Sequence, residues 1–130
     1  MSVARADADG VVASALEVLE IAEVAELLAV GGGEGVFTPE EVAYAAARSD
    51  PERRLAARLA AKRAACRALG SGMTERDVEV VRARYGPPWL RLSSRAQARM
   101  ARLGASQALV SLTHERRHAA ALVLLVGEGP

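Results

Sequence analysis

The segment 51–69 constrains the fold most, because its alanine-rich sequence predicts one long helix. Pro51 suits the first turn of a helix, where a missing backbone N–H leaves no hydrogen bond unmade. Gly70 and Gly72 follow the segment, and glycine tolerates the positive φ angles at which helices often end. We therefore expect a long helix as the element against which the rest of a small chain packs.

Upstream of this helix, the sequence predicts a short strand and a first helix. Residues 11–15 are a short apolar run that suits a strand, and apolar residues recur at helical spacing within 16–30. Residues 31–35 contain glycine at all but one position, which interrupts any regular element. This stretch lacks a phosphate-loop lysine, so we interpret it as a flexible hinge.

A second helix start is visible at Thr38. Its hydroxyl can cap the helix, Pro39 fits the first turn, and Glu41 can complete a capping box. The sequence therefore predicts that a helix begins directly after Thr38.

The second half of the chain alternates between short strand-like and helical segments. It predicts a hairpin with a turn at 85–88 and a later pair of apolar strands around the polar tip 114–118. The predicted strands are 78–81, 89–92, 108–113 and 119–126, and a short helix covers 94–103. Separate helices combined with a hairpin-rich sheet predict an α+β fold with an antiparallel-rich sheet packed on the long helix.

Composition limits the broad class of protein. The 130 residues suit a single domain spanning 1–130, and 17 Lys and Arg against 16 Asp and Glu favour neither nucleic acid nor a membrane as partner. No apolar run approaches a membrane span. The single cysteine, Cys66, cannot form an internal disulfide and is expected to be a buried small residue. These features predict a cytoplasmic protein.

Five motifs occur in a characteristic order along the chain. They are Glu17-Val-Leu-Glu-Ile21, Phe37-Thr-Pro-Glu-Glu41, the helix 54–70, Gly86-Pro87-Pro88 and Val110-Ser-Leu-Thr-His114. In this order the chain resembles the holo-acyl-carrier-protein synthases, the small 4'-phosphopantetheinyl transferases. The resemblance implies the fold of that family, a homotrimer with coenzyme A bound between subunits, and transfer of phosphopantetheine to a serine of a carrier protein.

The resemblance also reveals an altered metal site. The family's two magnesium-ligand positions correspond here to Glu17 and Arg63, so one carboxylate is kept and the other is replaced by a cation. Replacing glutamate by arginine changes the local charge by two units, which repels a divalent cation at contact distance. We expect neither magnesium nor another metal to bind here, with Glu17 as the only surviving ligand position.

Basic residues of the long helix could serve an anion instead. Arginine pairs with phosphate through a planar guanidinium group that keeps its proton. Two interpretations are open for the basic residues of the helix, a diphosphate site or an ordinary solvated face. These residues are Arg58, Lys62, Arg63 and Arg67. Because the resemblance implies that this helix lies at the cofactor, we favour the anion site. The same resemblance assigns Gly86, Pro88 and His114 to the cofactor, with coenzyme A as the expected ligand.

Candidate catalytic residues are Glu17, Arg63 and His114. The sequence leaves His114 equally open to a role at the cofactor and to a hydrogen-bonded place at a strand end. For His118 we favour the structural role. Trp89, the single tryptophan, is expected in the core or at a subunit interface.

The resemblance implies that the first helix docks the carrier protein. In the family this helix is basic and the carrier protein is acidic, whereas here the predicted helix bears acidic residues. Glu17, Glu20, Glu23 and Glu26 lie there, without lysine or arginine. Together with Arg63, this acidic helix favours a divergent protein that is not an efficient transferase. Such a protein would be noncatalytic or recruited to another step of carrier-protein, fatty-acid or polyketide metabolism. Its partner would be a carrier protein or a pathway intermediate. Two alternatives stay open, namely an active synthase and a structural subunit of a mixed oligomer.

Overall fold

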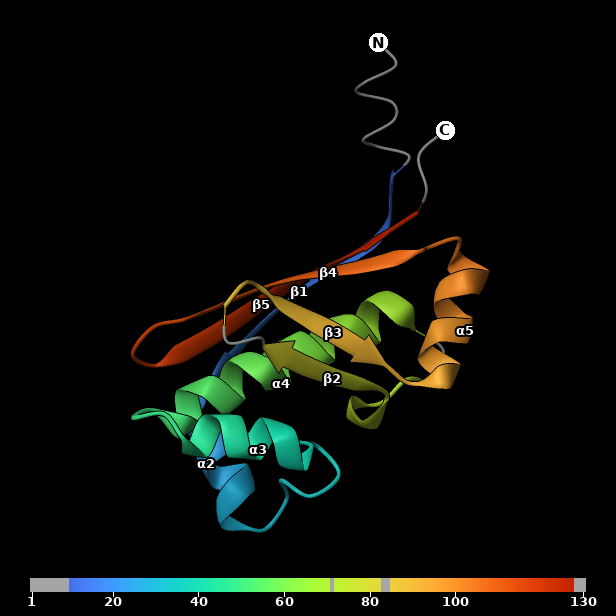
Figure 1. Cartoon of the computed structure of the whole chain (residues 1–130). Coiled ribbons are helices and arrows are strands. Elements are labelled where there is room, and N and C mark those ends of the chain that lie inside the picture. Colours follow the sequence, from blue (N-terminus) through green and yellow to red (C-terminus); the bar gives the residue numbers. More distant parts are fainter. Residues whose placement is uncertain (1–9, 71, 83–84, 128–130) are drawn as a thin grey trace.

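The computed structural model describes residues 10–70, 72–82 and 85–127. Its helix α4 runs along one face of a three-stranded sheet, a two-stranded hairpin lies beside them, and shorter helices flank both ends (Figure 1). The elements in chain order are β1 (Val11–Glu20), α2 (Ile21–Ala29), α3 (Pro39–Ala46), α4 (Pro51–Leu69), the 3-10 turn η1 (Glu75–Asp77), β2 (Val78–Arg82), β3 (Pro88–Leu92), α5 (Ser94–Leu103), β4 (Gln107–His114) and β5 (His118–Val126).

The core lies between α4 and the larger sheet. The strand order is β1-β5-β4, all antiparallel, so β5 is central. Along β5, Ala119, Ala121, Val123 and Leu125 are buried at alternate positions, as the period of a strand requires. Most of the side chains that α4 buries are alanines, whose small size lets the helix lie close to the strands. The predicted α+β architecture is therefore confirmed.

Strand β1 is longer than the sequence analysis predicted. It continues to Glu20, and α2 begins only at Ile21, so the helix predicted from residue 16 is wrong for 16–20. The reason is tertiary, since β1 pairs with β5 from Val11 through Glu20 and buries Ala15 and Leu19 at period two. As a result, two of the four glutamates assigned to the first helix lie on the strand.

The other predicted elements are confirmed. Helix α4 has the predicted bounds, and Gly70 after it has a φ of 71°. The capping box at α3 is present, with Thr38 Oγ1 accepting from the Glu41 backbone N–H and the Glu41 carboxylate accepting from Thr38 N–H. Strands β2 to β5 and α5 match their predicted ranges to within one residue at each end.

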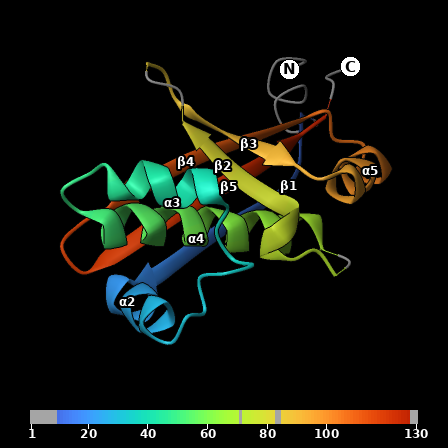
Figure 2. The same ribbon diagram turned by 60° about the horizontal axis from the view of Figure 1, so that its bottom comes forward.

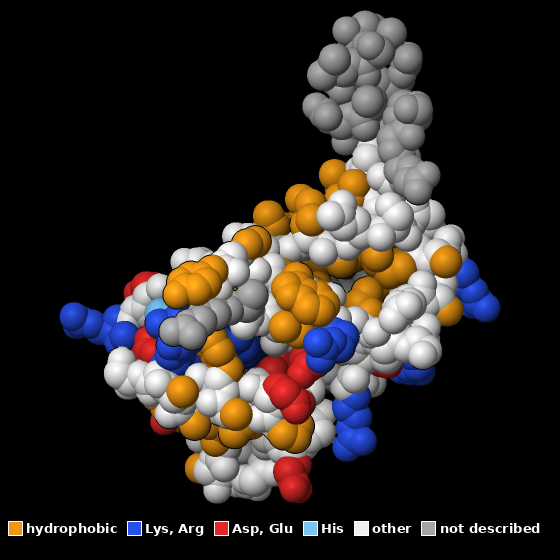
Figure 3. Space-filling model, viewed as in Figure 1, with side chains coloured by type: hydrophobic (Ala, Val, Ile, Leu, Met, Phe, Trp, Pro, Cys, Tyr) orange, Lys and Arg blue, Asp and Glu red, His pale blue; other side chains and the backbone are white. Residues whose placement is uncertain are grey.

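The sheet face opposite α4 is apolar and uncovered in the single chain. Leu16 and Val18 of β1 are 59% and 57% exposed, and Leu109 of β4 and Leu122 of β5 are exposed beside them. In Figure 3, hydrophobic side chains follow the upper edge of the molecule, where this sheet lies. No helix in the described part of the chain is long and apolar enough to cross a membrane.

Candidate functional site

Helix α4 places the predicted cations on two different faces. Residues four apart on a helix share a face, so Arg58 and Lys62 point one way while Arg63 and Arg67 point another. The first pair is buried, whereas Arg63 is half-buried and Arg67 exposed. The four side chains therefore do not form the single cationic lining that the sequence analysis favoured.

Lys62 lies in the interior, with 1% of its surface exposed. Its Nζ is 2.6 Å from Oε1 of the buried Glu41 and donates a hydrogen bond of 2.6 Å to the carbonyl of Val36. The other Glu41 oxygen accepts from the backbone N–H of Val80. This buried pair ties α3, α4 and β2 together, and the contact of Lys62 with the cofactor stays a prediction from the resemblance.

Four charged residues form a cluster where α4 lies beside β1 and α2 (Figure 2). We call Glu17, Glu23, Arg63 and Arg67 the charge cluster. Arg67 Nη1 is 2.7 Å from Glu17 Oε2 and also donates to the carbonyl of Leu16 at 2.9 Å. Arg63 Nη1 is 2.7 Å from Glu23 Oε2. Each carboxylate thus faces one guanidinium.

The described residues contain no group of three or more histidine, cysteine, aspartate or glutamate side chains arranged to hold a metal ion. At the charge cluster, both candidate oxygen donors are already engaged by arginine. What the arrangement offers instead is two guanidinium groups with further hydrogen-bond donors that reach solvent, in a cluster whose charges balance.

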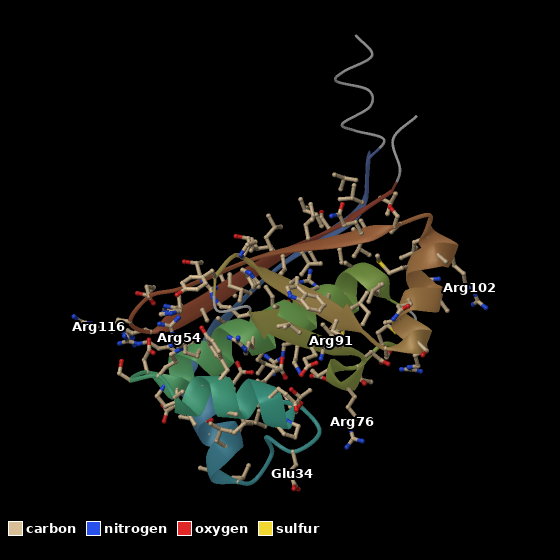
Figure 4. All side chains as sticks on the ribbon, in the orientation of Figure 1. Glu34, Arg54, Arg76, Arg91, Arg102 and Arg116 are labelled. Carbon is tan, nitrogen blue, oxygen red and sulfur yellow. The ribbon has the colours of Figure 1, made fainter. Side chains whose placement is uncertain are left out.

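A second group of arginines lines a pocket of about 290 Å³ between α3, α4, the end of β2 and the end of β4. We call it the arginine pocket, and the polar side chains that line it are Tyr44, Arg54, Arg58, Arg82, Thr113 and His114. Figure 4 labels Arg54 near the tip of the β4–β5 hairpin, and Lys and Arg side chains gather at this end in Figure 3. The pocket therefore concentrates positive charge.

Arg58 is the key group in this pocket. It is 3% exposed, and its Nε is a buried donor with no hydrogen-bond partner among the described residues. Burial lowers the pKa of Arg58. A buried unpaired donor is costly in a native structure and calls for an acceptor. An anion entering the pocket would supply one.

Tyr44 lies between two cations, with the guanidinium carbons of Arg48 and Arg58 at 4.5 and 4.1 Å from its ring centroid. Burial acts to raise the pKa of Tyr44, but a hydrogen bond with Arg48 and the charges of nearby arginines lower it overall. The guanidinium groups beside Tyr44 make this part of the pocket favourable to an anion.

His114 ends β4 at the rim of the pocket and is half-buried. Within the described residues its ring has no hydrogen-bond partner, so its nitrogens are available to a ligand. Arg54 is held by Asp50 at 3.0 Å. The sequence analysis missed Tyr44, Arg54 and Arg82. Arg54 shares a face with Arg58 by i,i+4 spacing and could have been found, whereas Arg82 comes from a distant strand.

The remaining singled-out residues lie elsewhere. Trp89 is 46% exposed with Arg91 over its ring, so it is not a core residue of the single chain. His118 Nδ1 is 2.9 Å from Glu115 Oε1, in keeping with a structural role. Cys66 is only half-buried, and burial raises the pKa of its thiol to about 11.

Gly86 and Pro88 belong to the β2–β3 hairpin, at its turn and at the start of β3. Gly86 has a φ of 114°, which glycine adopts most easily. Neither residue lines the arginine pocket. Their assignment to the cofactor stays a prediction from the resemblance.

Comparison with known proteins gives close relatives, although no protein-family model matches the chain. The chain is 39% identical over 122 residues to the holo-[acyl-carrier-protein] synthase of Anaeromyxobacter sp. (strain K), covering 88% of this chain and 95% of that protein. It is 42% identical over 118 residues to the holo-[acyl-carrier-protein] synthase of Thermus thermophilus, covering 88% and 93%.

Solved structures agree. The acyl carrier protein synthase of Mycobacterium tuberculosis superposes with a TM-score of 0.72 at 34% identity, over 93% of this chain and 100% of that chain. An ACPS–CoA complex from Chronobacterium ammoniagenes gives 0.75 at 27% identity, over 88% and 96%. The predicted phosphopantetheinyl-transferase-like fold is confirmed.

These relatives correct the main functional interpretation of the sequence. Arg63 and the acidic first helix favoured a noncatalytic or repurposed protein, yet relatives at 39% and 42% identity over most of the chain are holo-acyl-carrier-protein synthases. That interpretation gave two local charge changes too much weight, and its acidic helix was partly a strand. By its sequence and its fold, the chain belongs to the holo-acyl-carrier-protein synthase family.

Proposed function

We propose that the protein is an active holo-acyl-carrier-protein synthase, transferring 4'-phosphopantetheine from coenzyme A to a serine of a carrier protein. The names of its close relatives support this activity. The observation that carries the proposal is the arginine pocket, in which the buried Arg58 keeps an unpaired donor. Such a pocket suits a phosphate-bearing substrate.

Coenzyme A offers two anionic parts, a 3'-phosphate on the ribose and a diphosphate further along. The arginine pocket suits the 3'-phosphate, with Arg58 beneath it and His114 at the rim. A related synthase has been solved in complex with CoA. The diphosphate then needs a second cationic site.

In the reaction, the serine Oγ forms a bond to the phosphorus that carries pantetheine. The bond from that phosphorus to the bridging oxygen breaks, and 3',5'-ADP leaves with the electron pair. The serine proton must pass to a base. Our candidate is Glu17, because it is the carboxylate retained at the family's first ligand position.

The site is completed by a second copy of the chain in a homotrimer. Within one chain the arginine pocket and the charge cluster lie on different faces of α4, so one coenzyme A is better served by the pocket of one subunit and the cluster of the next. The uncovered face around Leu16, Val18 and Leu122 gives the copies an apolar surface to bury. Sedimentation should give three times the chain mass, and a monomer at micromolar concentration would contradict the assembly.

The activity is tested by incubating the full chain at catalytic concentration with coenzyme A, magnesium and an apo carrier protein. Mass spectrometry should find the carrier heavier by one phosphopantetheine. A carrier protein with its acceptor serine replaced by alanine is the matched control. The absence of product after many hours, with correctly folded protein, would refute the proposal.

The pocket itself is tested by Arg58→Gln, which removes the buried guanidinium. We expect a raised KM for coenzyme A with a smaller change in kcat, because the 3'-phosphate lies away from the reacting phosphorus. The exposed Arg102 on α5 is a suitable control position. An unchanged KM would remove the pocket from the binding site.

A further inference from the structure

The charge cluster contains an arrangement that magnesium does not fit. Magnesium requires near-octahedral oxygen coordination and is bound by carboxylates together with substrate phosphates. Here Glu17 is held by Arg67, Glu23 is held by Arg63, and the described residues bring no third ligand. A divalent cation at Glu17 would have to displace one guanidinium and stay close to another.

We propose that Arg63 and Arg67 form a phosphoanion site that takes over the charge-neutralising role of a divalent cation, so that this chain binds the diphosphate of its substrate without metal. The inference rests on the proposed function for the identity of the diphosphate. The site itself rests on the geometry of the cluster.

The two arginines are suitably placed for such a site. They lie one turn apart on the same face of α4, and among the described residues only Nη1 of each donates a hydrogen bond. Each guanidinium therefore keeps further N–H donors within a planar fork that matches phosphate oxygens. Arg63 is about one-third exposed and Arg67 about three-fifths, so an incoming anion can reach both.

The present partners of these arginines are exchangeable. Ion pairs as exposed as Arg63 with Glu23 contribute little to stability, because water screens them. A diphosphate carries more negative charge than a carboxylate and can displace it. Once Arg67 turns to phosphate, Glu17 is released, and its free carboxylate can accept the proton of the attacking serine.

The balance of charges within the cluster supports a site that works without a metal ion. Without ligand, the two glutamates balance the two arginines, so the cluster needs no bound cation for neutrality. In the transition state, charge develops on the oxygens around the transferred phosphorus and on the leaving bridging oxygen. Fixed positive groups near those atoms stabilise it, as arginine does in other phosphoryl transfers.

The binding site is tested by calorimetry with inorganic pyrophosphate and the full chain, in excess chelator. We expect wild type to bind without metal and Arg63→Gln to weaken binding about ten-fold or more, since a charged hydrogen-bond donor is lost. Arg63→Lys should lie between them, because it keeps the charge and loses the fork. Arg102→Gln, a surface arginine on α5, should bind like wild type.

Two results would overturn the proposal: binding by wild type that requires magnesium, or Arg63→Gln binding as tightly as wild type. In the second case the anion occupies the arginine pocket instead. Carrier loading separates this inference from the proposed function. If pyrophosphate binding behaves as expected but no condition yields a loaded carrier, the phosphoanion site stands and the synthase activity does not. Loading that proceeds with magnesium and stops in chelator contradicts the metal-free role.

Discussion

Lys62 and Arg63 are neighbours on α4, and each pairs with a glutamate at almost the same distance, 2.6 and 2.7 Å. Their surroundings differ, because the Lys62 side chain is 1% exposed and that of Arg63 35%. Burial, and not the length of an ion pair, decides how firmly each charge is held to its partner.

The two ion pairs differ in energy because water screens the exposed pair and is excluded from the buried one. Removing one partner of a buried pair leaves an uncompensated charge and costs about 3–5 kcal/mol. An exposed pair contributes about 0–1 kcal/mol and exchanges partners readily. Lys62 is therefore held firmly by Glu41, whereas Arg63 can exchange its partner.

The largest effect is expected for Lys62→Met, which fills similar space and strands the Glu41 carboxylate in the core. Unfolding in urea should give a loss of about 3–5 kcal/mol. Arg63→Met is the matched control and should lose less than about 1 kcal/mol. Equal losses for the two variants would contradict the distinction between the faces of α4.

Asp77 offers an intermediate case, with a buried carboxylate and an exposed partner in Arg95. It accepts from Arg95 Nε at 2.9 Å, Ser93 Oγ at 2.7 Å and Thr74 N–H at 2.9 Å. The hydrogen bonds from Arg95 hold the pKa of Asp77 well below its usual range, helped by those from Thr74 and Ser93.

Asp77→Asn should therefore lower stability at neutral pH. Because the folded pKa lies below the unfolded value of about 3.9, the contribution of Asp77 is complete above that pH and is lost as pH falls below it. Urea midpoints of wild type and variant should differ clearly at about pH 7 and converge below about pH 3. A gap that widens on acidification would contradict this ion pair.

Arg63→Glu tests the exposed side of the comparison by restoring a second carboxylate near Glu17. Calorimetry should find magnesium affinity raised about ten-fold or more over wild type. Arg102→Glu makes the same charge change on α5 and should leave magnesium binding unchanged. If wild type already binds magnesium as tightly as Arg63→Glu, the charge cluster is not the altered metal site.

The smallest effect concerns carrier docking. Glu26 is exposed on α2, and the described residues of that helix include no lysine or arginine. Glu26→Lys should lower KM for an acidic carrier protein a few-fold at low salt and leave kcat unchanged, because complementary charge speeds encounter. Glu34→Lys, in the loop labelled in Figure 4, is the control. A KM that does not respond at low salt would remove α2 from the docking surface.

Local signals predicted much of the fold. Thr38 with Glu41, and Pro51 with Gly70, mark helix ends through contacts a few residues apart, and the structure reproduces them. The end of β1 could not be found this way. Residues up to Glu20 suit a helix locally, and only pairing with β5, about a hundred residues later, makes them a strand.

For the candidate site, the sequence predicted that cations of α4 would act together, but it did not separate the buried face of the helix from the exposed one. Lys62 and Arg63 are neighbouring cations in one motif. The sequence around them does not show that Lys62 is buried and paired with Glu41 of α3. Arg82 reaches the arginine pocket from β2, which no spacing along the chain predicts. The functional error had a different origin, because two local charge changes were given more weight than the similarity of the whole chain to the synthases.

On the proposal above, arginines on the exposed face of α4 neutralise the diphosphate of coenzyme A while its phosphopantetheine part is transferred to the carrier. The most direct test of this proposal is the initial rate of carrier loading by wild type, measured in parallel with magnesium and with excess chelator. We predict rates that agree within about two-fold, with both falling at least ten-fold in Arg63→Gln. Loading that requires magnesium, with Arg63→Gln as active as wild type, would contradict a metal-free role for these arginines.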